Sequence, residues 1–168
     1  MKKLKLFVGL GAVALFIASC STPCPEVPVV EAIDMDAVRT EISALEAEYE
    51  RASNARDIEG VLTYYADDAV RYPPNGAALE GKEAIRAKMI ENQDTSDHSV
   101  TKLVVGDIFA DGKYVVEVGT YQGVAPDGTM ESRGRYVCVF ELRDGKYLCI
   151  RDIWNSEMPR KEDAAGEE

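Results

Sequence analysis

The sequence is short of the residues that most metal and nucleotide sites require. Its 168 residues include one histidine, His98, and four cysteines. It has neither a glycine-rich phosphate loop nor the Gly-x-Ser-x-Gly motif of serine hydrolases. Metal ligands clustered at characteristic spacings are missing as well. We therefore expect no metal and no cofactor, and no Cys–His nucleophile.

Basic residues are also scarce. Nineteen Lys and Arg stand against 30 Asp and Glu, which gives a formal net charge of −11. Such a surface repels phosphate backbones and anionic lipid headgroups. We expect no nucleic-acid binding, and any attachment to a membrane must come from something other than a basic patch.

The N-terminal apolar run, from Leu6 to Ala18, is too short for a stable membrane span. As a helix it would measure about 20 Å, against about 30 Å of hydrocarbon. It follows three lysines and ends in Ile17-Ala-Ser-Cys20, a pattern typical of a lipoprotein signal whose cysteine is acylated. An ordinary secretory signal with an incidental cysteine is the alternative. The pattern predicts a lipid-anchored protein of the cell envelope, facing the periplasm or the cell surface.

Four regions are expected along the chain. Residues 1–19 form the signal peptide, and residues 20–33 form the lipidated Cys20 with a proline-rich, extended tether. Residues 34–157 have the length and composition of one globular domain, and residues 158–168 form a charged, disordered tail.

The first half of this domain has helical patterns. Between Asp34 and about Arg56, apolar residues recur at alternating spacings of three and four, which predicts an amphipathic helix. A second helix is expected from Asp57 through Tyr65 and a third over residues 81–92, with a short strand near 69–73 between them.

The second half has strand patterns. Asp-Gly pairs at 111–112, 127–128 and 144–145 each separate two β-rich runs, and Asp-Gly is a strong hairpin signal. The runs predict a four-stranded antiparallel meander, and helices followed by a sheet indicate an α+β fold.

If each Asp-Gly pair forms a two-residue turn, the pairing of neighbouring strands is fixed. The alternation of side chains along each strand then assigns every residue of the meander to one of two faces. The face expected to receive the helices is the more aliphatic one, with Leu103, Val105, Phe109, Tyr114, Val116, Val118, Thr120, Arg135, Val137, Val139, Leu148, Ile150, Asp152 and Trp154. The opposite face mixes aromatic and charged residues, which is typical of a partly exposed or dimer-forming surface. Cys138 and Cys149 fall on it as diagonal neighbours, so buried thiols are expected rather than a disulfide.

Three segments together resemble the ketosteroid-isomerase/SnoaL-like family of the nuclear-transport-factor-2-like superfamily. They are Arg56–Ala69, which contains Tyr-Ala-Asp-Asp-Ala, then Gly81-Lys-Glu-Ala-Ile-Arg86, and Asp144–Trp154. The resemblance covers about residues 35–157 and implies a cone, in which three helices pack on a strongly curved antiparallel sheet around an open pocket. Many members pair through the outer sheet face. Members include isomerases, cyclases, dehydratases and non-catalytic binding modules, so the resemblance alone implies no single activity.

The family's catalytic positions are only partly matched. Tyr49 lies eight residues before Asp57, where the isomerases place the tyrosine that binds the enolate oxygen, and Trp154 matches a pocket aromatic. The position of the general base falls on Pro73. The second acid of the oxyanion hole would fall at one of residues 137–139, which are Val, Cys and Val. Steroid isomerisation is therefore not expected.

Asp152 is the main candidate for chemistry, because the expected register places its carboxylate on an apolar face. It would act as a general acid or base with Tyr49 as a hydrogen-bond donor, or it would form a structural ion pair with Arg135. Tyr49 would otherwise be a core tyrosine. The remaining expected pocket residues are Tyr65, Tyr72, Val118, Arg135, Val137, Val139, Ile150 and Trp154.

Three functions remain open for this domain. The leading hypothesis is a non-catalytic domain that binds a small, mostly apolar molecule in its pocket. The second is an enzyme that performs acid–base chemistry of the isomerase, cyclase or dehydratase type through Asp152 and Tyr49. The third is a dimerising envelope module whose pocket is filled by its own side chains.

Overall fold

The structure is a computed structural model that describes residues 32–93 and 99–158. The expected signal peptide, Cys20, Cys24, most of the tether, His98 and the tail from 159 onward lie outside the described residues. Within the described residues, no helix combines the length and the hydrophobicity that crossing a membrane requires.

The described elements follow the predicted order of helices and then sheet. They are α1 (Met35–Asn54), α2 (Ile58–Leu62), β1 (Tyr65–Tyr72), β2 (Leu79–Glu80), α3 (Lys82–Gln93), β3 (Val100–Ala110), β4 (Tyr114–Val124), β5 (Met130–Arg143) and β6 (Lys146–Ser156). The predicted α+β fold with three helices is confirmed. The second helix is shorter than predicted, because Tyr65 begins β1.

Local sequence explains where the first two helices begin. The Asp34 carboxylate accepts hydrogen bonds from the backbone N–H groups of Asp36 and Ala37 at the start of α1. Asp57 does the same for Gly60 at the start of α2. Both are N-caps, which supply acceptors to N–H groups that have no partner within the helix.

The six strands form one sheet in the order β2-β1-β6-β5-β4-β3. The antiparallel meander from β3 to β6 is confirmed. The early strand differs from the prediction of a wholly antiparallel sheet, because β1 pairs with β6 in parallel. Parallel neighbours need a long crossover between them, and here the chain from β2 through β5 provides it. This pairing places Arg71 directly beside Asp152.

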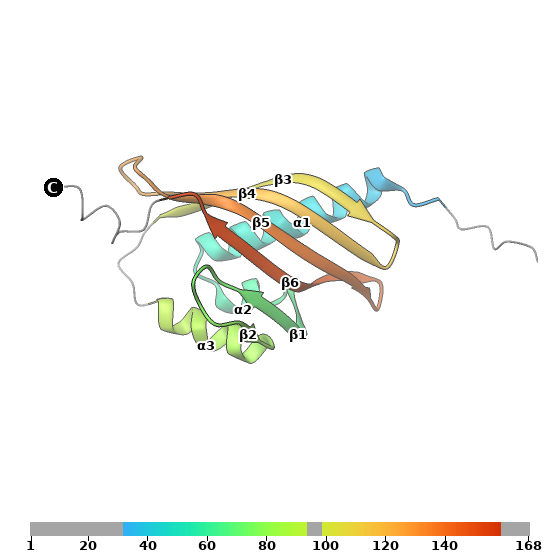
Figure 1. Cartoon of the computed structure of the whole chain (residues 1–168), viewed down its shortest axis with the longest axis horizontal. Helices are drawn as coiled ribbons and strands as arrows, with labels where there is room; N and C mark the ends of the chain where they lie inside the picture. Colours follow the sequence, from blue (N-terminus) through green and yellow to red (C-terminus); the bar gives the residue numbers. More distant parts are fainter. Residues whose placement is uncertain (1–31, 94–98, 159–168) are drawn as a thin grey trace, which may run out of the picture. The chain divides into compact units, whose positions relative to one another are not determined.

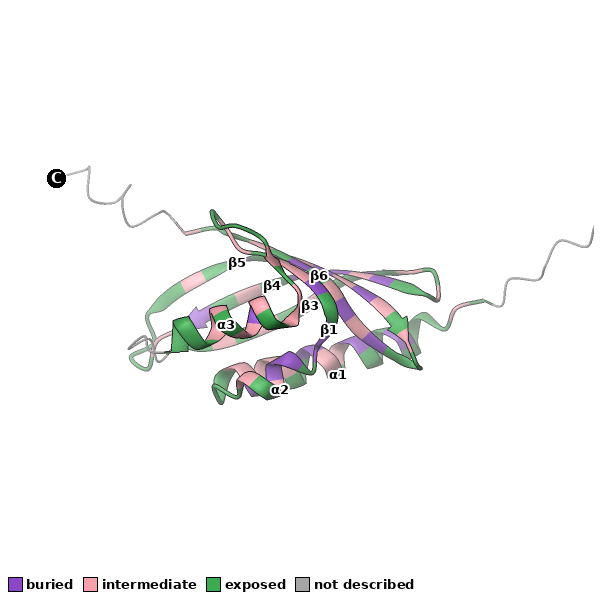
Figure 2. Ribbon diagram, turned by 90° about the horizontal axis from the view of Figure 1, so that it is seen from below, coloured by how far each residue is buried: buried purple, intermediate pink, exposed green. Residues whose placement is uncertain are grey.

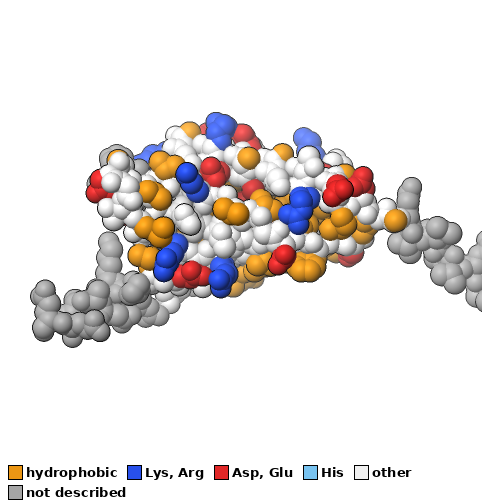
Figure 3. Space-filling view, turned by 90° about the horizontal axis from the view of Figure 1, so that it is seen from above, with side chains coloured by type: hydrophobic (Ala, Val, Ile, Leu, Met, Phe, Trp, Pro, Cys, Tyr) orange, Lys and Arg blue, Asp and Glu red, His pale blue; other side chains and the backbone are white. Residues whose placement is uncertain are grey.

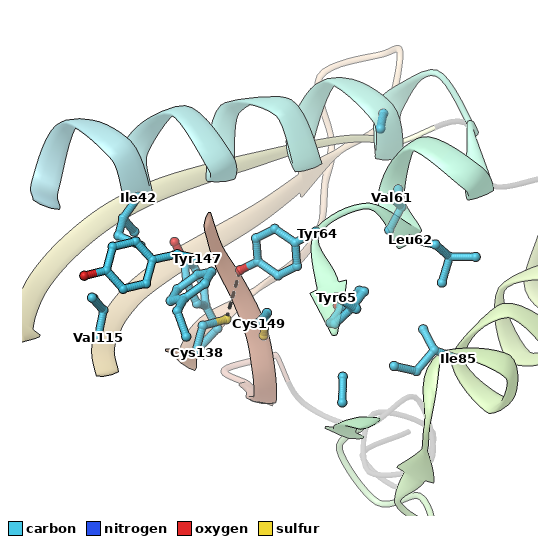
Figure 4. Packing of buried hydrophobic residues seen from close by; sticks show 14 of the residues in the cluster. Ile42, Val61, Leu62, Tyr64, Tyr65, Ile85, Val115, Cys138, Tyr147 and Cys149 are labelled. Carbon is cyan, nitrogen blue, oxygen red and sulfur yellow. Dashed lines mark hydrogen bonds between the residues drawn. The ribbon is translucent and has the colours of Figure 1, made fainter. Parts of the chain in front are cut away.

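The helices cover one side of the sheet (Figure 1). Helix α1 runs along the meander, α3 lies beside β1 and β2, and α2 contacts α1 and α3. Burial is concentrated where α1, α2 and the sheet face one another (Figure 2). The hydrophobic core includes the fully buried side chains of Ile42, Val61, Tyr65, Val115 and Cys149, together with Ile85 from α3 (Figure 4).

The predicted inner and outer faces of the meander are exchanged over most of its length. Residues expected outside are buried under α1: Val115, Glu117, Tyr136, Cys138, Phe140, Tyr147 and Cys149. Residues wrongly expected inside lie on the opposite face: Phe109, Tyr114, Val116, Val118, Thr120, Arg135, Val137, Val139, Leu148 and Ile150. The prediction favoured the more aliphatic face. The buried face instead carries aromatic rings whose polar groups find partners inside the molecule.

Two β-bulges explain why the exchange is incomplete. One lies in β3 between Val105 and Asp107, and the other lies in β6 between Cys149 and Arg151. An extra residue in one strand moves the residues beyond it to the other face. Asp152 and Trp154 therefore lie inside, beyond the second bulge. At the first bulge, a Cβ on Gly106 would come within 2.4 Å of the Val118 carbonyl oxygen, so the close approach of β4 requires glycine there.

Candidate functional site

An open cavity of about 220 Å³ lies between α1 and the inner face of the sheet. Its lining comes from α1, the turn before β1, and every strand except β2. The lining residues are Glu46, Tyr49, Ser53, Tyr64, Arg71, Thr101, Leu103, Tyr121, Ser132, Tyr136, Cys138, Asp152 and Trp154. We call this the first cavity.

Asp152 is held at one end of the first cavity by two donors. Arg71 Nε donates to its Oδ2 at 3.0 Å, and the Tyr65 hydroxyl donates to the same oxygen at 2.7 Å. The Asp152 side chain is 9 % exposed and the Arg71 side chain 19 %, so the pair is largely screened from water. Charge-assisted hydrogen bonds are strong in such surroundings. The Asp152 carboxylate is therefore fixed in place and its charge balanced.

Arg71 connects this ion pair to the aromatic wall. Its Nη2 donates to the Tyr49 hydroxyl at 3.1 Å. Its guanidinium carbon lies 4.4 Å from the centre of the Trp154 ring, a cation–π contact. Tyr49, Asp152 and Trp154 are thus joined through one arginine that the sequence analysis did not select.

The predicted ion pair of Asp152 exists with a different partner. Arg135 is exposed on the opposite face, where its Nη1 lies 3.5 Å from Glu157. The expected diagonal contact depended on placing Arg135 inside, and the exchanged faces remove it. Arg71 replaces it because of the parallel pairing of β1 with β6.

Two more carboxyl groups belong to this region: Glu46 lines the first cavity, and Glu117 lies outside its lining. Glu46 on α1 is 3 % exposed and Glu117 on β4 is 0 % exposed. The Tyr64 hydroxyl donates to Glu46, and the Tyr136 hydroxyl donates to Glu117 Oε1 at 2.6 Å. Burial, and next the charge of Glu117, raise the pKa of Glu46 to about 9. Glu46 therefore carries a proton at neutral pH.

That proton accounts for an otherwise unsatisfied oxygen. Glu117 Oε2 is, among the described residues, a buried side-chain oxygen without a hydrogen-bond donor. Burial raises the pKa of Glu117 as well, and its interactions with Tyr136 and with the Glu46 carboxyl oppose that rise. The two carboxyl groups share one proton, with Glu46 as the donor.

The cavity wall is rich in aromatic rings. Tyr64 contacts Tyr49, Tyr65 and Phe140, with ring centres 4.8, 5.0 and 5.4 Å apart. Burial raises the pKa of Tyr49, Tyr64 and Tyr65, so their hydroxyls are neutral donors. These rings give the site flat apolar walls with polar groups at fixed points.

Two thiols lie beside this wall. Cys138 and Cys149 are buried and unbonded, as predicted. Cys138 Sγ lies 3.3 Å from the Tyr64 hydroxyl oxygen (Figure 4). Hydrogen bonding to Cys149 and burial raise the pKa of Cys138, so it remains a thiol. A thiol in this state is a poor nucleophile.

A second cavity, of about 260 Å³, adjoins the first. The two share Tyr49, Ser53, Arg71 and Thr101 in their linings. The Arg71–Tyr49 hydrogen bond thus lies where both cavities meet. The second cavity extends toward α2 and the end of α3, where Asp57, Ile58 and Met89 line it.

The predicted pocket residues fall into three groups. Tyr49, Asp152 and Trp154 line the first cavity. Tyr65 lies behind it as a donor to Asp152, and Tyr72 is 39 % exposed at the end of β1, outside the lining. The third group lies on the opposite face of the sheet, so the prediction that its members line the pocket is wrong: Val118, Arg135, Val137, Val139 and Ile150.

Sequence reasoning missed the groups that make the cavity polar. Glu46 lies four residues after Ile42 on the buried stripe of α1, and an acid within an apolar stripe was the available signal. Glu117 and Tyr136 were assigned to the wrong face. No motif or spacing in the neighbouring sequence indicated that Arg71 belongs to the site. The expectation of an apolar lining with few polar groups is therefore wrong, and the cavity is aromatic with carboxyl, hydroxyl and guanidinium groups. In residues 32–93 and 99–158, no three His, Cys, Asp or Glu side chains group as metal ligands would.

Comparison with known proteins supplies a family and a fold. The SnoaL-like domain family matches residues 45–149. An NTF-2 like protein of unknown function from Shewanella oneidensis has a TM-score of 0.62 and 17 % identity, covering 70 % of this chain and 98 % of its own. A ketosteroid isomerase-like protein from Erwinia carotovora has a TM-score of 0.61 and 16 % identity, covering 71 % and 96 %.

A putative calcium/calmodulin dependent protein kinase II association domain from Xanthomonas campestris has a TM-score of 0.58 and 24 % identity, covering 77 % of this chain and 94 % of its own. At these identities the three structures show a shared fold. No curated protein is significantly similar to the chain.

The raised pKa of Glu46 predicts a pH-dependent stability. Between about pH 4.5 and 9 the folded state holds a proton on Glu46 that the unfolded state releases, so stability falls as the pH rises through this window. Glu46→Gln keeps a neutral donor and removes the ionisation. Measured by urea unfolding at pH 9, the variant should exceed the wild type by at least about 1.4 kcal/mol, the equivalent of one pKa unit.

At pH 5 the two proteins should differ much less, because Glu46 is then protonated in both states. Glu41 is an exposed acid on the same helix, and Glu41→Gln is the matched control. Identical pH dependence in wild type and Glu46→Gln would contradict the assignment.

Proposed function

Because the chain belongs to the SnoaL-like domain family, we propose that its domain binds a small molecule in the first cavity. The observation that carries this proposal is an open cavity of about 220 Å³ whose polar groups are already held in place. A domain with a purely structural role would have this space filled by its own side chains. An apolar cavity of about 150 Å³ is large enough for benzene, so a ligand somewhat larger than one ring fits here.

The cavity selects for a molecule with a flat or compact apolar part and a polar end. Tyrosine and Trp154 rings supply the apolar walls. Arg71 uses Nε for Asp152 and Nη2 for Tyr49, which leaves Nη1 as the donor for a ligand oxygen. Because hydrogen bonds and ring contacts fix these side chains, little conformational entropy is lost when a ligand binds.

Native mass spectrometry of residues 25–168, produced with export to the periplasm and gently desalted, tests this proposal. We expect a discrete adduct that disappears on denaturation, directly after purification or after exposure to metabolite extracts. A bare protein mass under all of these conditions would contradict small-molecule binding.

We also propose that a second copy of the chain covers the outer face of the sheet. This face carries Val116, Val118, Val137 and Val139, all partly exposed, and Ile153, which is 50 % exposed. An aliphatic face of this kind is typical of obligate interfaces. A dimer mass in the same native spectrum supports this assembly, and a monomer alone contradicts it.

Attachment to the envelope through Cys20 remains part of the proposal. It is supported by the Lys-rich start, the short apolar run and the small residues before the cysteine. Cys20→Ser should abolish incorporation of a labelled fatty acid and move the protein from the membrane to the soluble fraction. Cys24→Ser, four residues further on, is the control and should remain membrane-bound. Equal membrane recovery of both variants would rule out Cys20 as the anchor.

Acid–base catalysis is the second candidate function. It is favoured by the arrangement of Asp152, Arg71 and Tyr49 in one cavity, because a carboxylate and a phenol could act on opposite sides of a carbonyl substrate. In this scheme Asp152 moves the proton and Tyr49 stabilises the oxygen.

Asp152→Asn keeps the shape of the side chain and removes its charge. If the domain is an enzyme of this type, turnover should fall at least about 100-fold, the lower end of the usual contribution of general acid–base catalysis. Arg135→Gln, on the opposite face, is the control. Unchanged turnover in Asp152→Asn would eliminate this candidate.

A further inference from the structure

The inner part of the first cavity holds more acidic groups than the surrounding protein neutralises. Asp152 is paired with Arg71, whereas no basic side chain among the described residues forms an ion pair with Glu46 or Glu117. Arg39 acts on Glu117 only through its charge, and its Nη1 donates to the Gly106 carbonyl oxygen. The protein therefore balances this acid pair with a proton on Glu46.

The position of the pair matters because Glu46 itself lines the cavity. Buried carboxyl groups in a close pair are costly, since each disfavours the ionisation of the other. A positive charge entering beside Glu46 would offset this repulsion between the two carboxyl groups.

The walls around this position are aromatic. Tyr64 and Tyr136 hold the two carboxyl groups and also line the cavity, together with Tyr49, Tyr121 and Trp154. The faces of such rings attract cations, most strongly when water is excluded. The net charge of −11 on the chain concentrates cations near the protein and repels anions.

We propose that the first cavity binds a small organic cation, an amine or a quaternary ammonium, whose charge lies beside Glu46 and whose alkyl groups lie against the tyrosine rings. This inference rests on the proposed small-molecule binding and narrows it to one class of ligand. An oxygen elsewhere on the same ligand would accept from Arg71.

Other ligand classes fit less well. The guanidinium of Arg71 already balances the charge of Asp152 and donates to Tyr49. An anion would therefore lie among carboxyl groups without a free positive charge among the described lining residues to balance it. A bare metal ion needs several strong ligands around one point, and the part of the chain that is described offers no such group. Aromatic rings instead suit a large, weakly hydrated cation.

Binding of a cation should release the proton of Glu46. Its pKa is raised to about 9, so below that pH the cation must replace the proton, and affinity should increase as the pH rises from 7 to 9. Several groups face Glu46 from the surrounding elements: Arg39, Tyr64, Glu117, Tyr136, Cys138 and Asp152. Burial raises the pKa of both tyrosines and contributes to the raised pKa of Cys138, so these three stay protonated in this range.

Choline and 3,3-dimethyl-1-butanol have nearly the same shape, but only choline is charged. A comparison of their affinities therefore measures the contribution of the positive charge to binding. By isothermal titration calorimetry on the purified protein at pH 7.5, choline should bind roughly tenfold more tightly or better, the advantage expected of a desolvated cation–aromatic site. Repeating the titration in buffers of different ionisation enthalpy should show release of nearly one proton. From pH 7 to 8.5, choline affinity should rise roughly 25-fold, because release of one proton changes the affinity about tenfold per pH unit below the pKa of Glu46.

Glu46→Gln should weaken choline binding about tenfold, abolish proton release and leave the binding of the neutral alcohol unchanged. Glu41→Gln should behave as wild type. Because glutamine resembles the protonated acid, this variant is expected to fold. If Glu46→Gln does not fold, two measurements on the wild type still test the inference: the difference in affinity between choline and the alcohol, and the number of protons released on choline binding.

Binding of the alcohol as tightly as choline, or choline binding without proton release, would overturn the inference while small-molecule binding stands. Failure of both probes would overturn it as well. Small-molecule binding itself is contradicted by a different result, namely the absence of any adduct in native mass spectrometry.

Discussion

The ion pair between Arg71 and Asp152 is the interaction on which the site depends. It exists because β1 lies parallel to β6 and brings the two residues side by side. Arg71 then positions Tyr49 and Trp154, and Tyr65 completes the hydrogen bonds of the carboxylate. Loss of either partner would leave a largely buried charge unpaired, which typically costs about 3–5 kcal/mol. The same pair thus organises the cavity and joins β1 to β6.

A second constraint is the polar character of the buried face. Aromatic rings fill the space between the sheet and α1, and their hydroxyls need partners once they are buried. Glu46 and Glu117 supply those acceptors, at the cost of a shared proton. A cavity with hydrogen-bonding groups at fixed points is the result, and this is the property that a binding site needs.

Much of the fold could be predicted because its signals are local. Asp34 and Asp57 cap helices within a few residues, and each Asp-Gly pair turns the chain between adjacent strands. The hairpin between β4 and β5 has the predicted register over most of its length. The candidate site was harder, because Tyr49, Asp152 and Trp154 were reached through the family resemblance or the expected register, whereas Arg71 and Glu46 act through contacts between distant segments.

The fold class, the order of helices and strands, the acidic charge and the family follow from the amino-acid sequence alone, because propensities, turns and charge are properties of neighbouring residues. Tertiary packing is what selects the inner face of the sheet, because both faces of the meander carry apolar residues and only the folded chain shows which of them α1 covers. The bulged residues 106 and 150 then change the face locally within β3 and β6. The tertiary structure also decided that Asp152 pairs with Arg71 and that Glu46 keeps its proton. Ion pairs and protonation depend on burial and on partners far away in the chain, and these exist only after folding.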